Sequence, residues 1–136
     1  MLPTTREWVL KAEGDYDVIS VLLRSRKPSR HDAICFHAQQ CAEKYLKGRL
    51  VEAGVAFAKI HHLPALLNLA LTIQPKWSVL AGSFTVLTKY SVLPRYPGMS
   101  ATGPDARAAV ATCRKFRKLA GRASASNKGN GILLPL

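Results

Sequence analysis

Acidic residues are scarce in this chain. Its 136 residues include 8 Asp and Glu against 20 Lys and Arg, which gives a formal charge of +12. Residues 1–58 hold nine basic and seven acidic residues, whereas residues 59–136 hold eleven basic residues and one acidic residue. A surface that binds a polyanion is therefore expected in the C-terminal part of the chain.

Long apolar runs and cysteine motifs are also missing. The longest nearly apolar run, residues 63–73, is far shorter than the roughly 20 residues that a membrane span needs. The charged N-terminus lacks the apolar stretch of a signal peptide, so we expect a cytoplasmic protein without membrane association. The 3 cysteines show no CxxC or zinc-finger spacing, so they are interpreted as small buried residues, and neither a metal nor a cofactor is expected.

Apolar residues make up 48% of the chain, which suffices for one core. Five segments show the 3.6-residue period of amphipathic helices, and no segment shows the sustained alternation of a half-buried strand. The sequence therefore predicts an all-α fold, an antiparallel up-and-down bundle of four to five helices. The bundle should occupy residues 1–123, with residues 124–136 as a flexible C-terminal tail.

Capping signals mark the first two predicted helices. Thr4 and Glu7 have the spacing of a capping box, and the helix should end before Pro28. Ser29 and Asp32 repeat the signal at the start of the longest helix, which should reach about residue 53, with Gly54 just after it. The predicted core faces are Trp8, Ala12, Tyr16, Ile19 and Leu23 in the first helix, and Ile34, Ala38, Cys41, Ala42, Tyr45 and Leu46 in the second.

Three further helices are predicted beyond residue 60. A short one should follow His61 and His62 and close at Pro75. The next should run over about 77–93, and the last from a Thr102–Asp105 capping box to about residue 122. Their predicted core residues are Trp77, Leu80, Phe84 and Leu87 in the former, and Ala109, Cys113, Phe116 and Ala120 in the latter.

The longest helix carries a polar stripe beside its apolar face. Five side chains fall within an arc of about 100°: Arg30, His37, Gln40, Lys44 and Lys47. Such a stripe is suited to a phosphate or nucleotide, because Lys and Arg supply charge while His and Gln supply directional hydrogen bonds. The alternative is a solvated polar face of a bundle helix, and spacing alone leaves both open.

Several short motifs in this chain resemble the HEPN domain family. The run FHAQQCAEKYLK (36–47) is followed by Gly54, by HLPALL (62–67), and by Tyr90 with RYPG (95–98). The likeness covers residues 5 to about 122. It implies a helical bundle that commonly forms a homodimer, encoded beside a minimal nucleotidyltransferase as a toxin–antitoxin-like pair, with links to nucleotide binding and metal-independent RNA cleavage.

RNA-cleaving members resemble one another in an Arg and a later His with four to six residues between them. In that pair Arg stabilises phosphorane charge and His moves a proton. Arg30 and His37 have this spacing, but early in the chain, and Arg95 lies in the expected late region without a His after it. The departure favours a nucleotide- or RNA-phosphate-binding component over an enzyme. The alternatives are a metal-independent endoribonuclease, with Arg30, His37 and Arg95 as its catalytic residues, and a purely structural module.

Other residues carry narrower expectations. Asp15 on the apolar arc of the first helix should find a cation, Lys44 or Arg95, unless it lies at the edge of that arc in water. His61 and His62 are adjacent, so a helix cap is expected more than metal ligation.

Arg95 and Tyr96 lie in a Pro-flanked loop suited to a phosphate and a stacked base, or to a packed turn. The basic arc of the last helix (Arg107, Arg114, Lys115, Arg117, Lys118 and Arg122) suits nucleic acid, an acidic partner or simple solubility.

Overall fold

The computed structural model describes residues 1–92 and 97–126, with side chains up to residue 121, and every element in these ranges is helical. In chain order they are α1 (Pro3–Leu22), α2 (Arg30–Glu52), α3 (Leu63–Ala70), the 3₁₀ helix η1 (Pro75–Leu80), α4 (Ala81–Leu87), the 3₁₀ helix η2 (Thr88–Ser91) and α5 (Gly103–Ser126). No helix within those ranges is long and apolar enough to cross a membrane.

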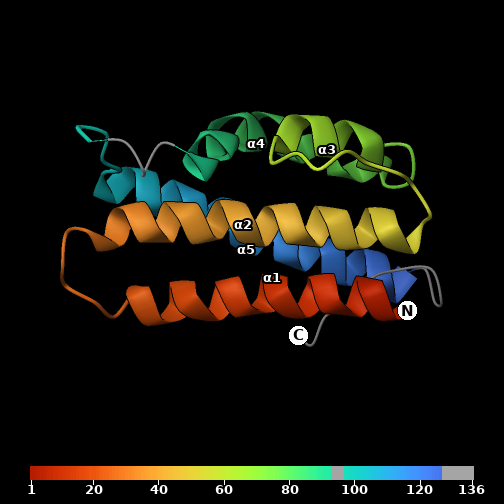
Figure 1. Ribbon diagram of the computed structural model, residues 1–136, viewed down its shortest axis with the longest axis horizontal. Helices are drawn as coiled ribbons and strands as arrows, with labels where there is room; N and C mark the ends of the chain where they lie inside the picture. The colour runs from red at the N-terminus through yellow and green to blue at the C-terminus, as the bar shows by residue number, and fades with distance from the viewer. Residues whose placement is uncertain (93–96, 127–136) are drawn as a thin grey trace.

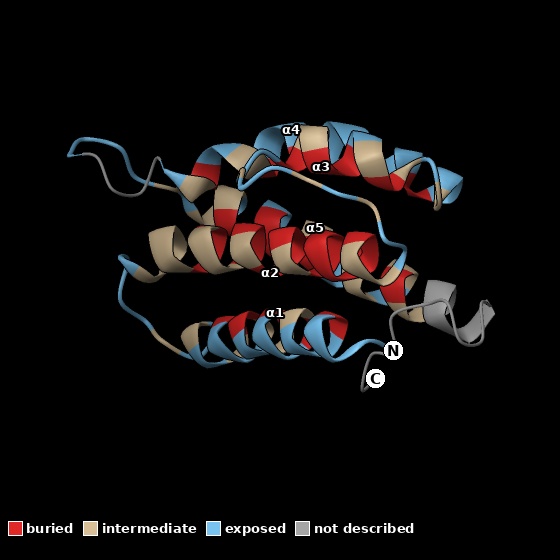
Figure 2. Cartoon of the chain, turned by 45° about the vertical axis from the view of Figure 1, so that its right-hand side comes forward, coloured by how far each residue is buried: buried red, intermediate tan, exposed pale blue. Residues whose placement is uncertain are grey.

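The helix α2 occupies the middle of the bundle (Figure 1). On one side it packs against α1, and on the other lies the layer of α3, η1, α4 and η2, while α5 runs behind it. Buried residues on α1, α2 and the α3–α4 layer face this interior, and the outward side of α1 is exposed (Figure 2). The predicted all-α bundle is confirmed.

The predicted core faces of α2 and α5 are confirmed residue by residue. All six core positions of α2, and all four of α5, are buried. The Phe116 ring of α5 lies at the centre, edge-on to Tyr45, Trp77 and Phe84 at centroid distances of 6.0, 4.9 and 5.2 Å. Edge-to-face aromatic pairs add stabilisation beyond buried area, so this cluster joins α2, η1, α4 and α5.

The predicted start and core face of α1 are wrong in detail. The helix begins at Pro3, one residue before Thr4, and no side chain caps it. A proline suits the first helical position because its fixed φ is helical and its missing N–H is not needed. The buried residues are Thr5, Val9, Ala12, Asp15 and Ile19, so the core face is rotated from the expected one, and Leu23 lies beyond the helix with 41% of its surface exposed.

The capping prediction is wrong at α2 and confirmed at α5. Ser29 precedes α2 without a side-chain cap, and the Asp32 carboxylate instead accepts the Ala101 N–H at 2.6 Å. At α5, the Thr102 N–H donates to Asp105 at 2.9 Å and the Asp105 N–H donates to the Thr102 hydroxyl at 3.2 Å. These bonds lower the pKa of the Asp105 carboxyl. The end of α2 is as predicted, with Gly54 at φ +71°, a value that favours glycine.

The region between α2 and α5 is less regular than predicted. His62 caps α3, because its Nδ1 accepts the Ala65 N–H at 3.2 Å. The single helix expected over 77–93 is η1, α4 and η2 in succession, although Trp77, Leu80, Phe84 and Leu87 are buried as expected. The helix α5 continues to Ser126, and residues 127–136 of the predicted tail lie outside the described residues.

A candidate phosphate-binding surface

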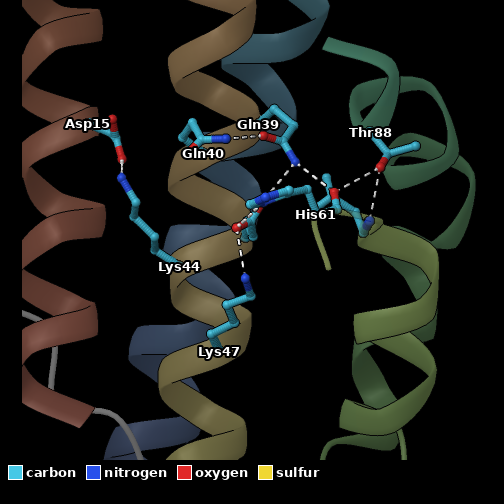
Figure 3. A network of polar contacts seen from close by, with 9 residues as sticks. Asp15, Gln39, Gln40, Lys44, Lys47, His61 and Thr88 are labelled. Carbon is cyan, nitrogen blue, oxygen red and sulfur yellow. Dashed lines mark hydrogen bonds and ion pairs between the residues drawn. The ribbon is translucent and has the colours of Figure 1, made fainter. Parts of the chain in front are cut away.

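His37 and Lys44 of the α2 stripe meet at one carboxylate. The Asp15 side chain lies in the α1–α2 interface, 8% exposed, with Oδ1 at 2.8 Å from His37 Nδ1 and Oδ2 at 2.6 Å from Lys44 Nζ. Figure 3 shows Lys44 reaching across to α1. The expectation that Asp15 finds Lys44 is therefore confirmed. A buried carboxylate needs such partners because the burial of an unpaired charge costs on the order of several kcal/mol.

Lys47 and Gln40 belong to a second polar cluster, which is centred on Glu43 of α2 and includes His61. The Lys47 ammonium lies 3.0 Å from Oε2 of the buried Glu43 and over the Trp8 and Phe57 rings. His61 Nδ1 is 3.0 Å from the same carboxylate.

Gln40 joins this cluster through Gln39. Its amide donates to Gln39 at 2.7 Å, and Gln39 donates to Glu43 at 3.2 Å and to the His61 carbonyl at 3.0 Å (Figure 3). These bonds from Gln39 and Glu43 hold the segment before α3 against α2. The Thr88 hydroxyl also donates to the His61 carbonyl, which joins the same segment to η2.

Arg30 lies apart from both clusters. Its guanidinium donates to the carbonyls of Leu23 and Ser25, in the turn after α1. His37 is seven positions further along α2, and this spacing corresponds to a distance of about 10.5 Å along the helix axis. Arg95 and Tyr96, the remaining predicted site residues, lie outside the described residues. The structure thus brings together His37 and Lys44, and directs Arg30 and Lys47 to other places.

A cavity that sequence reasoning missed lies beside Arg30. It has a volume of about 320 Å³ and is bordered by the end of α1, the first turns of α2, and α5. Its basic lining residues are Arg30, His31, Arg107 and Arg114, and no Asp or Glu is among the described residues that line it. The adjacency of Arg30 and His31 and the basic arc of the last helix were the available signals, but their meeting depends on the packing of α2 against α5.

The basic arc predicted for the last helix is present on α5, with one member removed. Arg107, Arg114, Lys115 and Lys118 are exposed and form no ion pair with any residue that the structure describes. Arg117 instead pairs with Glu13 of α1 at 3.0 Å and covers the Tyr16 ring, and the hydrogen bond to Glu13 raises the pKa of Arg117 against the opposing effect of burial. The side chain of Arg122 is not among those described.

The acids in the first turns of α2 and α5 border a different cavity. Asp32 and Asp105 line a separate cavity of about 240 Å³ together with Lys89 and Tyr90. Burial raises the pKa of Tyr90 to about 12 and that of the neighbouring Cys35 thiol to about 12. All three cysteines are buried and free, as predicted. Within the described ranges, no group of three His, Cys, Asp or Glu side chains is placed to hold a metal ion.

The fold places this chain among the small all-helical bundle domains. Comparison with known families then identifies the family. The family model of the HEPN domain matches residues 5–123. The chain therefore belongs to the HEPN domain family, as its motifs indicated. No curated protein and no solved structure matches it.

Proposed function

We propose that this HEPN domain binds the phosphates of RNA or of a nucleotide, as one component of a toxin–antitoxin-like pair with a minimal nucleotidyltransferase, and that it acts as a homodimer. The observation that carries the proposal is the row of exposed, unpaired cations on α5. Arg107, Arg114 and Lys118 are spaced by seven and four residues, so they follow one side of the helix within an arc of about 40°. We call these three residues and the neighbouring Lys115 the α5 row.

Such a row suits a phosphate backbone. Lys and Arg neutralise phosphates and release counterions, and these contacts position a nucleic acid without reading its sequence. Exposed cations are also common because they keep a protein soluble. Some form ion pairs within the chain, as Arg117 on the same helix does with Glu13. The four cations of the α5 row therefore remain available for an anionic partner.

The polar contacts of α2 support recognition over cleavage. A metal-independent nuclease needs an Arg and a His at the same phosphate. His37 is hydrogen-bonded to Asp15 beside Lys44, whereas Arg30 binds carbonyls in the turn after α1. We therefore assign His37 to the α1–α2 interface in this proposal.

Binding is tested by fluorescence anisotropy with a labelled single-stranded RNA over a salt series. We expect the double variant Lys115→Ala/Lys118→Ala to bind more weakly, with the slope of log K against log salt reduced by about 1.4, since each single-strand phosphate contact contributes about 0.7. The matched control, Lys59→Ala/Lys76→Ala, removes two exposed lysines outside α5 and should keep the slope. Absence of binding at low salt, or equal losses in both variants, overturns the proposal.

One observation favours the nuclease alternative. The Asp15 carboxylate contacts His37 Nδ1 and so orients the imidazole ring. This contact leaves Nε2 as the nitrogen that would transfer a proton. Incubation with RNA in the absence of metal decides between the two functions. Cleavage that disappears in His37→Ala would establish the nuclease; intact RNA in both samples agrees with recognition.

The proposed partner is tested separately. A minimal nucleotidyltransferase encoded next to this chain should coelute with it in size-exclusion chromatography after coexpression. A neighbouring gene of another kind, or separate elution, contradicts this part of the proposal and leaves the RNA-binding measurement unaffected.

A further inference from the structure

The cavity beside Arg30 has the composition of an anion-binding pocket. Its four basic side chains come from two helices that are far apart in sequence, Arg30 and His31 from α2, and Arg107 and Arg114 from α5. We call this cavity the α2–α5 pocket. Its volume of about 320 Å³ lies at the lower end of the roughly 300–1,000 Å³ of small-molecule sites. A single nucleotide unit suits this size better than a longer ligand.

His31 and Arg107 approach each other at the first residue of α5. A methyl group placed on Gly103 would lie 3.4 Å from a terminal guanidinium nitrogen of Arg107 and 3.8 Å from Nε2 of His31. Both side chains therefore reach the same point on the wall of the pocket. No hydrogen bond joins either side chain to another residue of the described chain, so the donors of both remain available.

Arg30 and Arg114 keep donors to spare. Arg30 uses one terminal nitrogen for the Leu23 and Ser25 carbonyls, and Arg114 uses Nε for the Tyr16 hydroxyl at 3.4 Å. A guanidinium has five N–H donors. These contacts hold the two side chains in position and leave further N–H groups of each for a ligand.

The pocket has an apolar floor and no opposing acid. Ile34, Ala106 and Val110 are buried beneath it. The acids in the first turns of the same helices are engaged elsewhere, Asp32 with the Ala101 N–H and Asp105 with Thr102, and both line the neighbouring cavity. An apolar floor with a cationic rim fits a ligand that combines a flat, weakly polar part with a dense negative charge.

We infer that the α2–α5 pocket binds a terminal phosphomonoester, on a free mononucleotide or at the 5′ end of an RNA strand. This inference rests on the proposed function and specifies which phosphate is recognised. A phosphomonoester carries about −1.5 to −2 charges at pH 7, whereas an internal phosphodiester carries one. Three arginines and a histidine that line one cavity therefore favour the terminal group.

The test compares two RNA strands of identical sequence, one with a 5′-phosphate and one with a 5′-hydroxyl, and compares AMP with adenosine. The wild-type chain should bind each phosphorylated ligand at least about tenfold more tightly, the effect of a charge-assisted hydrogen bond. His31→Ala and Arg107→Ala should lose this preference. Lys118→Ala, in the α5 row but outside the pocket, should weaken both strands equally. These variants spare Arg30, which also holds the turn after α1.

The outcomes separate this inference from the proposed function. Equal binding of the two strands, together with equal binding of AMP and adenosine, by the wild type overturns the pocket and leaves RNA binding by the α5 row standing. A preference for AMP over adenosine without binding of RNA supports the pocket, limits the proposed function to nucleotides, and overturns RNA binding by the α5 row. A preference that survives in both His31→Ala and Arg107→Ala overturns the assigned location. Preference for the phosphorylated strand alone assigns the ligand to RNA ends, and preference for AMP alone assigns it to free nucleotides.

Discussion

The cations of α2 fall into two groups with opposite environments. Lys44 and Lys47, in the later turns, each contact a carboxylate that is nearly buried, Asp15 on α1 and Glu43 on α2 itself. Arg30 and His31, in the first turn, border a cavity whose described lining residues include no acid. Arg30 shares one polar arc of α2 with Lys44 and Lys47, so position on a helical wheel does not separate these three residues. The elements packed against each turn decide which cations are neutralised and which are free for a ligand.

The two environments also differ in what a substitution should do. Removal of one partner from a buried ion pair leaves an uncompensated charge, which is strongly destabilising. Removal of an unpaired surface cation leaves no buried charge without a partner, so its effect on stability is small. The comparison can therefore be tested by measuring stability and ligand binding on the same set of variants.

The largest loss of stability is expected for Glu43→Ala. Its side chain is 4% exposed and that of Lys47 6%, so the variant leaves a buried ammonium without its counter-ion. We expect the free energy of unfolding to fall by about 3–5 kcal/mol in urea denaturation. Glu7→Ala, an exposed carboxylate on α1, is the control and should change it by less than about 0.5 kcal/mol. Equal effects of the two substitutions would contradict the assignment of Glu43 to a buried pair.

Asp15→Ala should have a smaller effect of the same kind. Lys44 and His37 are 22% and 28% exposed, so water compensates part of the lost pairing. We expect a loss of about 2–3 kcal/mol, below the value for fully buried pairs, by the same denaturation. Asp17→Ala, two residues away and exposed, controls for a general effect of charge on α1. A loss no larger than that of Asp17→Ala would place the Asp15 carboxylate in water.

Arg107→Ala should leave stability nearly unchanged, within about 0.5 kcal/mol, because Arg107 is exposed and has no ion-pair partner among the described residues. The same variant should lose the preference for phosphorylated RNA. Thermal unfolding of the protein that is used for binding measures both. A stability loss above about 1 kcal/mol would show that Arg107 belongs with the structural cations.

At neutral pH no effect of charge is expected at a buried group that lies between the two sets in sequence, the Cys35 thiol, and its contribution appears only in alkaline solution. Burial raises its pKa from 9.0 to about 12. Above pH 9 the unfolded chain loses this proton while the folded chain keeps it, so the stability present below pH 9 declines as pH rises toward 12. Cys35→Ala should therefore make the decline shallower, by at most about 1.4 kcal/mol per pH unit. An unchanged slope in denaturation at pH 9 to 11 would contradict a buried thiol.

Local patterns predicted the core better than they predicted the site. The apolar periods of α2 and α5 and the Thr102–Asp105 capping box depend on neighbours within one helix, and all three are found in the structure. The core face of α1 was misplaced because the nearly buried Asp15 interrupts the apolar pattern, and its burial depends on Lys44, which is 29 residues away. The α2–α5 pocket requires Arg30 and Arg107 to be adjacent, and no pattern within either helix encodes that proximity.

The hydrogen bond from the Ala101 N–H to Asp32 spans 69 residues and ties the start of α5 to the start of α2. It anchors the chain two residues before α5 to the first turn of α2, so the helix starts that carry Arg107 and Arg30 are held together by a direct contact. Loss of the Asp32 carboxylate should therefore let Arg30 and Arg107 move apart.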